Sequence, residues 1–318
     1  MARNAANGFP GRRFPAGGNI AAFMKWFARN IDVWYGIVGG GQVWYVDANE
    51  GSDGNNDGQS WETAFATMSP LDTKLANGDT IRFRGVLRQQ WTPPIDVFDV
   101  KLIGEANNPR QATDGGVATG GGATWLEPTA PTAATALLTL REQSWSIYNI
   151  FFSNTQASSA CIKLHRTEVS AAMDASHAQI IGCRFGGGAP AIEDYGGCSN
   201  VQIIDCVFHD CTHAIQVTNQ GIAIPNKWLV SNCRIQPCTN GIVGAWVDSR
   251  FEYNYIEKST TTTINAASGN TGLRNSFFLN HFNIAAADFD PAGGVTGNAT
   301  DAWHSVLTDA VETGIPTN

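Results

Sequence analysis

Residues 179–192 read QIIGCRFGGGAPAI, and residues 202–215 read QIIDCVFHDCTHAI. Both stretches begin with Gln-Ile-Ile, carry a cysteine at the fifth position and a phenylalanine at the seventh, and end in isoleucine. Short runs of β-branched and aromatic residues, separated by Gly, Asp and Thr, favour strands over helices. Each stretch is therefore predicted to form a strand, a turn and a second strand.

The same pattern occurs six times in the second half of the chain. A cysteine or asparagine recurs at intervals of 21 to 34 residues and defines one column: Asn149, Cys183, Cys206, Cys233, Asn254 and Asn275. A large apolar residue stands two positions after each of them: Phe151, Phe185, Phe208, Ile235, Ile256 and Phe277. An isoleucine follows nine to thirteen positions after each: Ile162, Ile192, Ile215, Ile242, Ile264 and Ile284. A period of this length with short apolar strands predicts stacked coils that bury their faces against one another.

These coils predict a parallel β-helix. A leucine-rich repeat has a similar period but needs a leucine frame that is absent here, and propeller blades of about 40–50 residues are too long. Successive coils of a β-helix lie about 4.8 Å apart, so equivalent side chains stack. We expect the Asn/Cys column to form a ladder at a bend, and the Phe and Ile columns to line the core.

The first part of the chain carries a second signal. Residues 44–58, WYVDANEGSDGNNDG, and residues 61–68, WETAFATM, are followed by residues 78–85, GDTIRFRG. Together they resemble the opening turn, short helix and first strand of the pectate-lyase-like right-handed β-helix proteins. The resemblance covers residues 43–290 and implies an all-β, right-handed, single-stranded parallel β-helix. It leaves the activity open, because this superfamily contains lyases, hydrolases, phage tailspikes and inert spikes.

We divide the chain into three parts. Residues 43–290 are the predicted β-helix, and residues 291–318 an acidic C-terminal cap that resembles the endings of phage β-helix proteins. Residues 1–42 are an N-terminal arm, in which residues 20–31 are expected to form an amphipathic helix that caps the solenoid. The arm is expected to anchor the protein in a virion through its aromatic and cationic residues: Phe9, Arg12, Arg13, Phe14, Lys25, Trp26 and Arg29.

Charge and composition limit the partners. The chain has 318 residues and a net charge of −8, whereas the arm carries five cations against one acid. A basic arm on an acidic body favours docking on an acidic protein surface, and no basic stripe that would bind nucleic acid crosses the body. The seven cysteines, an odd number, exclude a complete disulfide framework. We therefore expect reduced thiols packed in the core.

The sequence shows neither a secretion signal nor a membrane span. Residues 1–4 are mostly polar, no long apolar stretch follows them, and no run reaches the roughly 18 apolar residues of a spanning helix. We therefore expect no membrane partner, assembly in a host cytoplasm, and the virion as the final location.

The predicted register permits a search for catalytic acids. Glycoside cleavage by a carboxyl pair needs two acids about 5–5.5 Å or about 6.5–9.5 Å apart. No column stacks two acids on neighbouring coils, so Asp205, Glu193 and Asp210 are kept as unpaired catalytic candidates. The nearest constellation, His209 with Glu257, is separated by one intervening coil.

A metal site is also considered. Asp47, Asp53 and Asp57 resemble a calcium loop, since calcium prefers several carboxylate and carbonyl oxygens. The stretch lacks the spacing and the terminal bidentate glutamate of such a loop. No metal or cofactor is therefore predicted.

The sequence thus predicts a non-enzymatic phage virion structural protein. It would be a β-helical spike or fibre on the tail or the capsid, used for adhesion to the host surface or for particle decoration. Resemblance to tailspikes implies a homotrimer, other virion proteins as partners, and a host surface glycan as an optional one. The alternative is a tailspike depolymerase that hydrolyses or lyases a host surface polysaccharide. A third possibility is a carbohydrate-binding surface protein of a bacterium.

Overall fold

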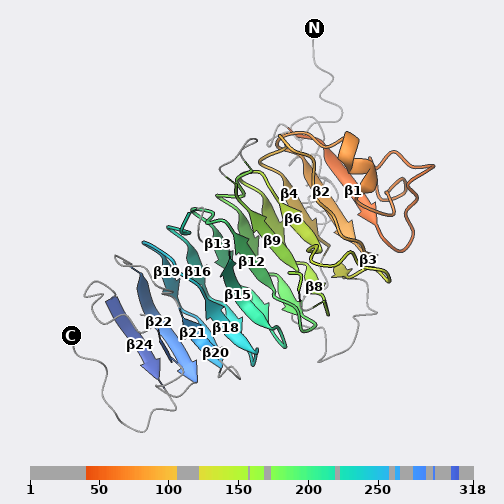
Figure 1. Ribbon diagram of the computed structural model, residues 1–318. Coiled ribbons are helices and arrows are strands. Elements are labelled where there is room, and N and C mark those ends of the chain that lie inside the picture. Colours follow the sequence, from red (N-terminus) through yellow and green to blue (C-terminus); the bar gives the residue numbers. More distant parts are fainter. Residues whose placement is uncertain are drawn as a thin grey trace, which may run out of the picture.

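The chain folds as an elongated stack of short β-strands, shown as a computed structural model in Figure 1. The structure describes residues 41–105, 122–156, 158–167, 173–218, 223–257, 262–265, 275–283, 289–290 and 302–307. The strands follow one another along the long axis from β1 to β24 (Figure 1). The fold class predicted from the sequence, an all-β right-handed parallel β-helix, is confirmed.

Each full coil contributes three strands, which form three stacks along the molecule. The first stack contains β1 (Val43–Asp47), β2 (Thr80–Arg84), β4 (Lys101–Gly104), β7 (Ser146–Tyr148), β10 (Gln179–Ile181), β13 (Gln202–Ile204), β16 (Leu229–Ser231), β19 (Arg250–Glu252) and β22 (Ser276–Asn283). The second contains β3 (Val86–Arg88), β5 (Thr124–Leu126), β8 (Phe151–Ser153), β11 (Arg184–Gly186), β14 (Val207–Phe208), β17 (Arg234–Ile235) and β20 (Tyr255–Glu257). The long strands β22 and β24 (Ala302–Leu307) span both stacks and join them into sheet A.

The third stack forms sheet B. It contains β6 (Leu138–Leu140), β9 (Ile162–His165), β12 (Ile192–Tyr195), β15 (His213–Thr218), β18 (Asn240–Val243), β21 (Thr262–Asn265) and β23 (Phe289–Asp290). A 3-10 helix, η2 (Ser69–Thr73), lies between β1 and β2. The sequence predicted two strands per coil, but a bend at Gly182 and Cys183 divides the first of them into β10 and β11.

The isoleucine column lies where the sequence predicted it, on the inner face of sheet B. Its members oppose one another on successive parallel strands: Ile162, Ile192, Ile215, Ile242 and Ile264. On the next strand Phe289 opposes Ile264, whereas the predicted member Ile284 lies outside the described residues. The side chains of Ile162, Ile192, Ile215 and Ile242 are fully buried and belong to the hydrophobic core.

The phenylalanine column differs from the prediction at both ends. Phe152, not Phe151, opposes Phe185, and the Phe152, Phe185 and Phe208 rings stack with centroids 5.5 and 5.1 Å apart. Phe151 lies on the outside, with the Arg184 guanidinium 5.7 Å from its ring. Phe277 belongs to the first stack, where it opposes Phe251.

The Asn/Cys ladder is confirmed in its centre and wrong at its ends. Strand register places Cys183, Cys206, Cys233 and Asn254 in one column, but Asn280, not Asn275, continues it. Asn254 Nδ2 donates to Asn280 Oδ1 at 3.0 Å, and the Cys233 amide donates to Asn254 Oδ1 at 2.8 Å. Each side chain thus satisfies a backbone or amide group of a neighbouring coil.

Asn149 and Asn275 have other places in the fold. Asn149 lies one position before the ladder, opposite Gly182, and has a φ of 56°. Asn275 lies opposite Ser249 in a different bend, where its Oδ1 accepts from the Ser249 amide at 3.1 Å. The sequence register failed here because β22 carries an irregularity between Phe278 and His281.

Bends with positive φ align in columns of their own. The bend between the first and second stacks uses six residues with φ between 51° and 64°: Asn149, Gly182, Asp205, Asn232, Tyr253 and Leu279. Asn, Asp and Gly suit this left-handed conformation, whereas bulky residues rarely adopt it. Tyr253 and Leu279 are therefore exceptions in an otherwise regular column.

All seven cysteines are free and buried, as the sequence predicted. The thiols of Cys183, Cys206 and Cys233 lie 3.4 to 3.8 Å from backbone carbonyl oxygens of the preceding coil. Burial raises the pKa of Cys198 and Cys206 well above the usual range of a thiol. These thiols act as small core side chains.

Asp47, Asp53 and Asp57, which resemble a calcium loop in the sequence, accept hydrogen bonds in and beside the loop between β1 and η2. Asp47 Oδ2 accepts from Arg84 Nε at 2.7 Å. Asp53 accepts from Ala66 and Thr67, and Asp57 from Gln59 and Thr63. These contacts fasten the loop to the first coil.

Several predictions lie outside the described residues. These include the arm with its seven anchoring residues and most of the segment 291–318. Within that segment, β24 pairs in parallel with β22, so sheet A extends past residue 290. No helix among the described residues combines the length and apolarity needed to span a membrane.

Candidate functional site

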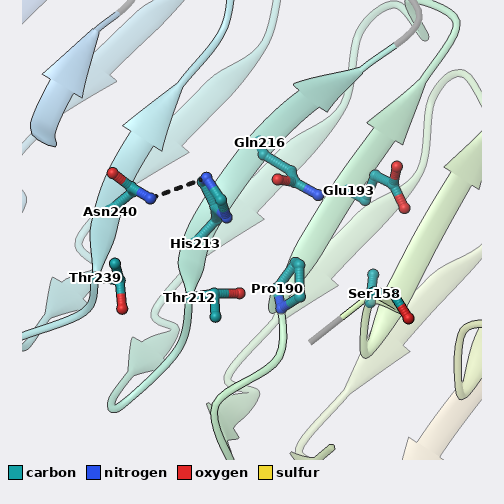
Figure 2. Close-up of a pocket in the computed structure, with 9 residues that line it drawn as sticks. Ser158, Pro190, Glu193, Thr212, His213, Gln216, Thr239 and Asn240 are labelled. Carbon is teal, nitrogen blue, oxygen red and sulfur yellow. Dashed lines mark hydrogen bonds between the residues drawn. The ribbon is translucent and has the colours of Figure 1, made fainter. Parts of the chain in front are cut away.

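A polar hollow lies on the outer face of sheet B, over β12, β15 and β18 (Figure 2). Its volume is about 350 Å³. Its lining residues are mostly polar: Ser158, Ala160, Pro190, Glu193, Thr212, His213, Gln216, Thr239 and Asn240. Its volume lies at the lower end of the range for small-ligand pockets, but its lining is more polar than theirs, which suits a polar ligand.

Strand alternation places these side chains outward. In β12, Ile192 and Asp194 are buried while Glu193 and Tyr195 face outward, because neighbouring residues of a strand point to opposite faces. Glu193 opposes Gln216 in β15. The same repeat that buries the isoleucine column therefore aligns one outward residue per coil beside it.

Glu193 is held by two neighbours. Its Oε1 accepts a hydrogen bond from Thr218 Oγ1 at 2.6 Å, and its Oε2 lies 3.8 Å from Lys163 Nζ. The side chains come from three successive strands of sheet B, β9, β12 and β15. The carboxylate is thereby fixed at the edge of the hollow, in a partly buried position.

His213 has one ring nitrogen paired and the other unpaired. Its Nε2 lies 3.0 Å from Asn240 Nδ2 (Figure 2). Since an amide nitrogen only donates, Nε2 is the acceptor in this arrangement, and the ring proton of the neutral histidine resides on Nδ1. Burial lowers the pKa of His213, while Glu193 opposes that shift. The neutral imidazole is thus favoured near pH 7.

Two buried polar atoms at the hollow lack a hydrogen-bond partner. They are His213 Nδ1 and Thr212 Oγ1, and both residues line the hollow. A buried polar atom without a partner is costly, so such atoms often mark a place for a ligand or a water molecule. An N–H donor next to a hydroxyl suits an oxygen-rich ligand.

A second group of side chains extends the site along the same face. Lys163 Nζ lies 4.1 Å from the centroid of the Tyr195 ring, and the His165 ring meets Tyr195 edge-on at 5.0 Å. Burial also lowers the pKa of His165, with Lys163 adding to the effect. Lys163 therefore links this group to Glu193.

An unusual carboxyl lies directly beneath the site. Asp194 points into the core, where its Oδ1 accepts from the Cys198 amide at 2.9 Å and its Oδ2 has no hydrogen-bond partner. Burial raises the pKa of Asp194 to about 7. The protonated form therefore predominates below neutral pH.

The structure separates the three acids named from the sequence. Glu193 lines the hollow, whereas Asp205 lies in the bend between β13 and β14, where it accepts from Asn232 Nδ2. Asp210 lies in the turn before β15 and contacts His209 Nδ1 at 2.9 Å. Neither of these two lines the hollow. Glu257 is ion-paired to Arg234 at 3.1 Å.

The sequence search missed Lys163, His213 and Gln216. Lys163 and Gln216, like Glu193, stand directly after a member of the isoleucine column. The search looked for stacked acids, whereas this outward column places lysine, glutamate and glutamine on successive coils. The polar position directly after each buried isoleucine thus identifies Lys163 and Gln216, but not His213, which lies two residues before Ile215.

Parallel coils with a polar hollow on one outer face define the chain as a parallel β-helix protein with a surface site. No protein-family model matches the chain, and no curated protein matches it.

Several solved structures have a similar fold at low identity. The GH136 lacto-N-biosidase from Eubacterium ramulus is similar over 84% of this chain, with a TM-score of 0.48 and 11% identity, and the chain spans 60% of its length. Carrot pectin methylesterase is similar over 84% of this chain and 89% of its own, with a TM-score of 0.44 and 13% identity. A rhamnogalacturonan lyase is similar over 77% of this chain and 68% of its own, with a TM-score of 0.39 and 10% identity.

The expectation of a non-enzymatic virion structural protein is wrong. The similar structures bear the names of enzymes, among them a biosidase, a lyase and an esterase. None of these three is named as a virion component.

Proposed function

We propose that the chain is an enzyme that binds and cleaves a polysaccharide on the outer face of sheet B. The observation that carries the proposal is the hollow of about 350 Å³, with an aligned carboxylate and unpartnered polar atoms on rigid strands. Hydroxyl-rich sugars match the donors and acceptors of Glu193, Gln216 and Thr212. Because the outer face is open, a long polysaccharide can reach the hollow without passing one end through a channel.

Elimination fits the residues better than hydrolysis by a carboxyl pair. Hydrolysis of that kind needs a second acid about 5–9.5 Å away, and Glu193 is the sole acid among the described residues that line the hollow. Elimination needs one base that removes a proton next to an acidic group of the sugar. The Gln216 and Asn240 amides offer donors that would hold that acidic group.

In this proposal Glu193 removes the proton. The carbon–oxygen bond to the leaving sugar then breaks, its electron pair departs with the leaving oxygen, and a double bond forms in the sugar that lost the proton. Lys163 and Thr218 orient the carboxylate. The Nδ1–H of His213 would donate a hydrogen bond to a sugar oxygen, and the leaving oxygen would take up a proton from water.

The test is turnover of polysaccharides by the purified chain. A panel of neutral and uronate-containing polysaccharides is incubated with the protein, and ultraviolet absorbance of unsaturated ends is followed together with reducing ends. Glu193→Gln is expected to lower the rate at least about 100-fold, the scale of a positioned general base. The matched control, Asp210→Asn, alters an acid outside the hollow and keeps the wild-type rate.

Two outcomes would contradict the proposal. Products with reducing ends but without unsaturated ends would show that the reaction is hydrolysis and not elimination. Full activity of the Glu193→Gln variant would show that the hollow is not the active site. The phage origin, the anchoring role of residues 1–42, the virion location and the homotrimer stay predictions.

A further inference from the structure

Two cysteines oppose each other on neighbouring coils, in the turn that leads from sheet A to sheet B. Strands β15 and β18 pair in parallel with His213 opposite Asn240, and Cys211 and Cys238 stand two positions before these residues. The register continues into the turn, because the Thr239 amide donates to the Cys211 carbonyl oxygen at 2.8 Å. Opposed residues of adjacent coils lie about 4.8 Å apart, and a disulfide spans about 4.4–6.8 Å between Cα atoms.

The two thiols also interact with each other. The Cys211 thiol donates a hydrogen bond to the Cys238 sulfur, which lowers the pKa of Cys238, while burial opposes the shift. The same hydrogen bond, together with burial, raises the pKa of Cys211 well above the usual range of a thiol. Cys238 is therefore the sulfur that loses its proton more readily. The thiolate is the form of cysteine that reacts with oxidants.

The surroundings of this pair differ from those of the cysteine ladder. Although both residues are buried, their chain neighbours Asp210 and Thr239 are exposed. Cys206 lies in the ladder instead, where burial raises its pKa well above the usual range. Oxidation of a cysteine follows thiolate character and access. The pair in the turn meets these two conditions better than the ladder does.

From these observations we propose that Cys211 and Cys238 form an oxidation site, at which hydrogen peroxide converts the two thiols into a disulfide between neighbouring coils. The Cys238 sulfur attacks one peroxide oxygen, the oxygen–oxygen bond breaks, and a sulfenic acid forms with release of water. The Cys211 sulfur then attacks the Cys238 sulfur, the sulfur–oxygen bond breaks, and a second water leaves. Peroxide gains the two electrons that the sulfur atoms lose, and both thiol protons end in water.

The disulfide would tie together two coils that carry the hollow. Thr212 directly follows Cys211, Thr239 directly follows Cys238, and both threonines line the hollow. The bridge would therefore fix the spacing of the two coils at this edge of the hollow. Because a cross-link also restricts the unfolded chain, the oxidised chain is expected to melt at a higher temperature than the reduced chain.

The experiment counts the thiols of the full chain after treatment with hydrogen peroxide in the folded state. The chain is first fully reduced, then treated, unfolded in the presence of a maleimide and digested for mass spectrometry. The treated chain is expected to lose two of its seven thiols and to yield two peptides linked through Cys211 and Cys238, which dithiothreitol separates. The pair is expected to react at least about ten-fold faster than Cys206, the matched buried cysteine.

Three variants assign the two sulfur atoms. Cys206→Ala is expected to keep the loss of two thiols, and Cys238→Ala to abolish it. Cys211→Ser retains a hydroxyl donor beside Cys238, so Cys238 is expected to stop at the sulfenic acid, which dimedone labels. A wild type that keeps all its thiols under peroxide would overturn the proposal, as would a disulfide that joins other cysteines first. Because thiols and not turnover are counted, the outcome is independent of what the hollow binds.

Discussion

At the residue scale, asparagine performs two different tasks in this solenoid. Asn254 and Asn280 stack inside the coils and bond backbone groups of neighbouring coils. Asn149 and Asn232 lie in the bend and adopt positive φ. In the sequence the two tasks look alike, because one position separates the bend from the ladder. The structure tells them apart by strand register.

This difference predicts that substitution by glycine destabilises the chain strongly at a ladder position and only slightly at a bend position. Asn254→Gly leaves the Cys233 amide and the Val230 carbonyl without their partners, and each buried loss costs about 1–3 kcal/mol. Asn149→Gly keeps a residue suited to positive φ and is expected to change stability little. Chemical denaturation of both variants checks this. Equal destabilisation would show that Asn149 also belongs to the ladder.

Asp194 predicts a dependence of stability on pH. Its pKa is raised to about 7 in the folded chain, above the ordinary value of 3.8, so the native state holds the proton more tightly than the unfolded state. The contribution of this proton to the free energy of unfolding is therefore complete below about pH 4. It is lost as pH rises to about 7, with a slope near 1.4 kcal/mol per pH unit.

Asp194→Asn removes the titrating carboxyl group and is expected to reduce the decline of the free energy of unfolding with rising pH. The free energy of unfolding is measured for both proteins between about pH 4 and pH 7, the window set by the raised pKa. Asp210→Asn, which changes an exposed carboxyl, serves as the control and is expected to keep the wild-type slope. An Asp194→Asn variant with an unchanged slope would contradict the assigned protonation.

At the element scale, each coil is fixed by its inward side chains. The isoleucine column could be predicted because those residues follow the strand period without interruption. The Phe151 position was predicted wrongly, because the interval from Asn149 to Cys183 is longer than the others and a one-residue slip reverses the face. The division of sheet A by a bend also escaped prediction, since two strands of three residues resemble one longer strand.

The one-residue difference between the predicted and the observed register of β8 can be tested directly by mutation. Phe152 is buried and stacks between Trp125 and Phe185, so Phe152→Ala is expected to cost about 3–5 kcal/mol. Phe151 faces outward, so Phe151→Ala is expected to cost about 1 kcal/mol or less. Melting curves of the two variants distinguish these outcomes. The reverse order of stability would place Phe151 in the core.

At the scale of the whole molecule, the outer face of sheet B carries the proposed function, because the hollow lies on it. The sequence predicted Glu193 as an unpaired acid but not its neighbours, because their convergence depends on three coils folding in register. Stacked coils keep such side chains in fixed positions, which suits a site for an extended polymer.

The central claim is that polysaccharide is bound and cleaved over Glu193 on sheet B. The most direct measurement is a crystal structure of Glu193→Gln with an oligosaccharide derived from a polysaccharide that the wild type cleaves. We predict sugar density in the hollow, with a sugar oxygen within hydrogen-bond distance of His213 Nδ1 or Thr212 Oγ1. Sugar bound on another face, with the hollow empty, would contradict the account.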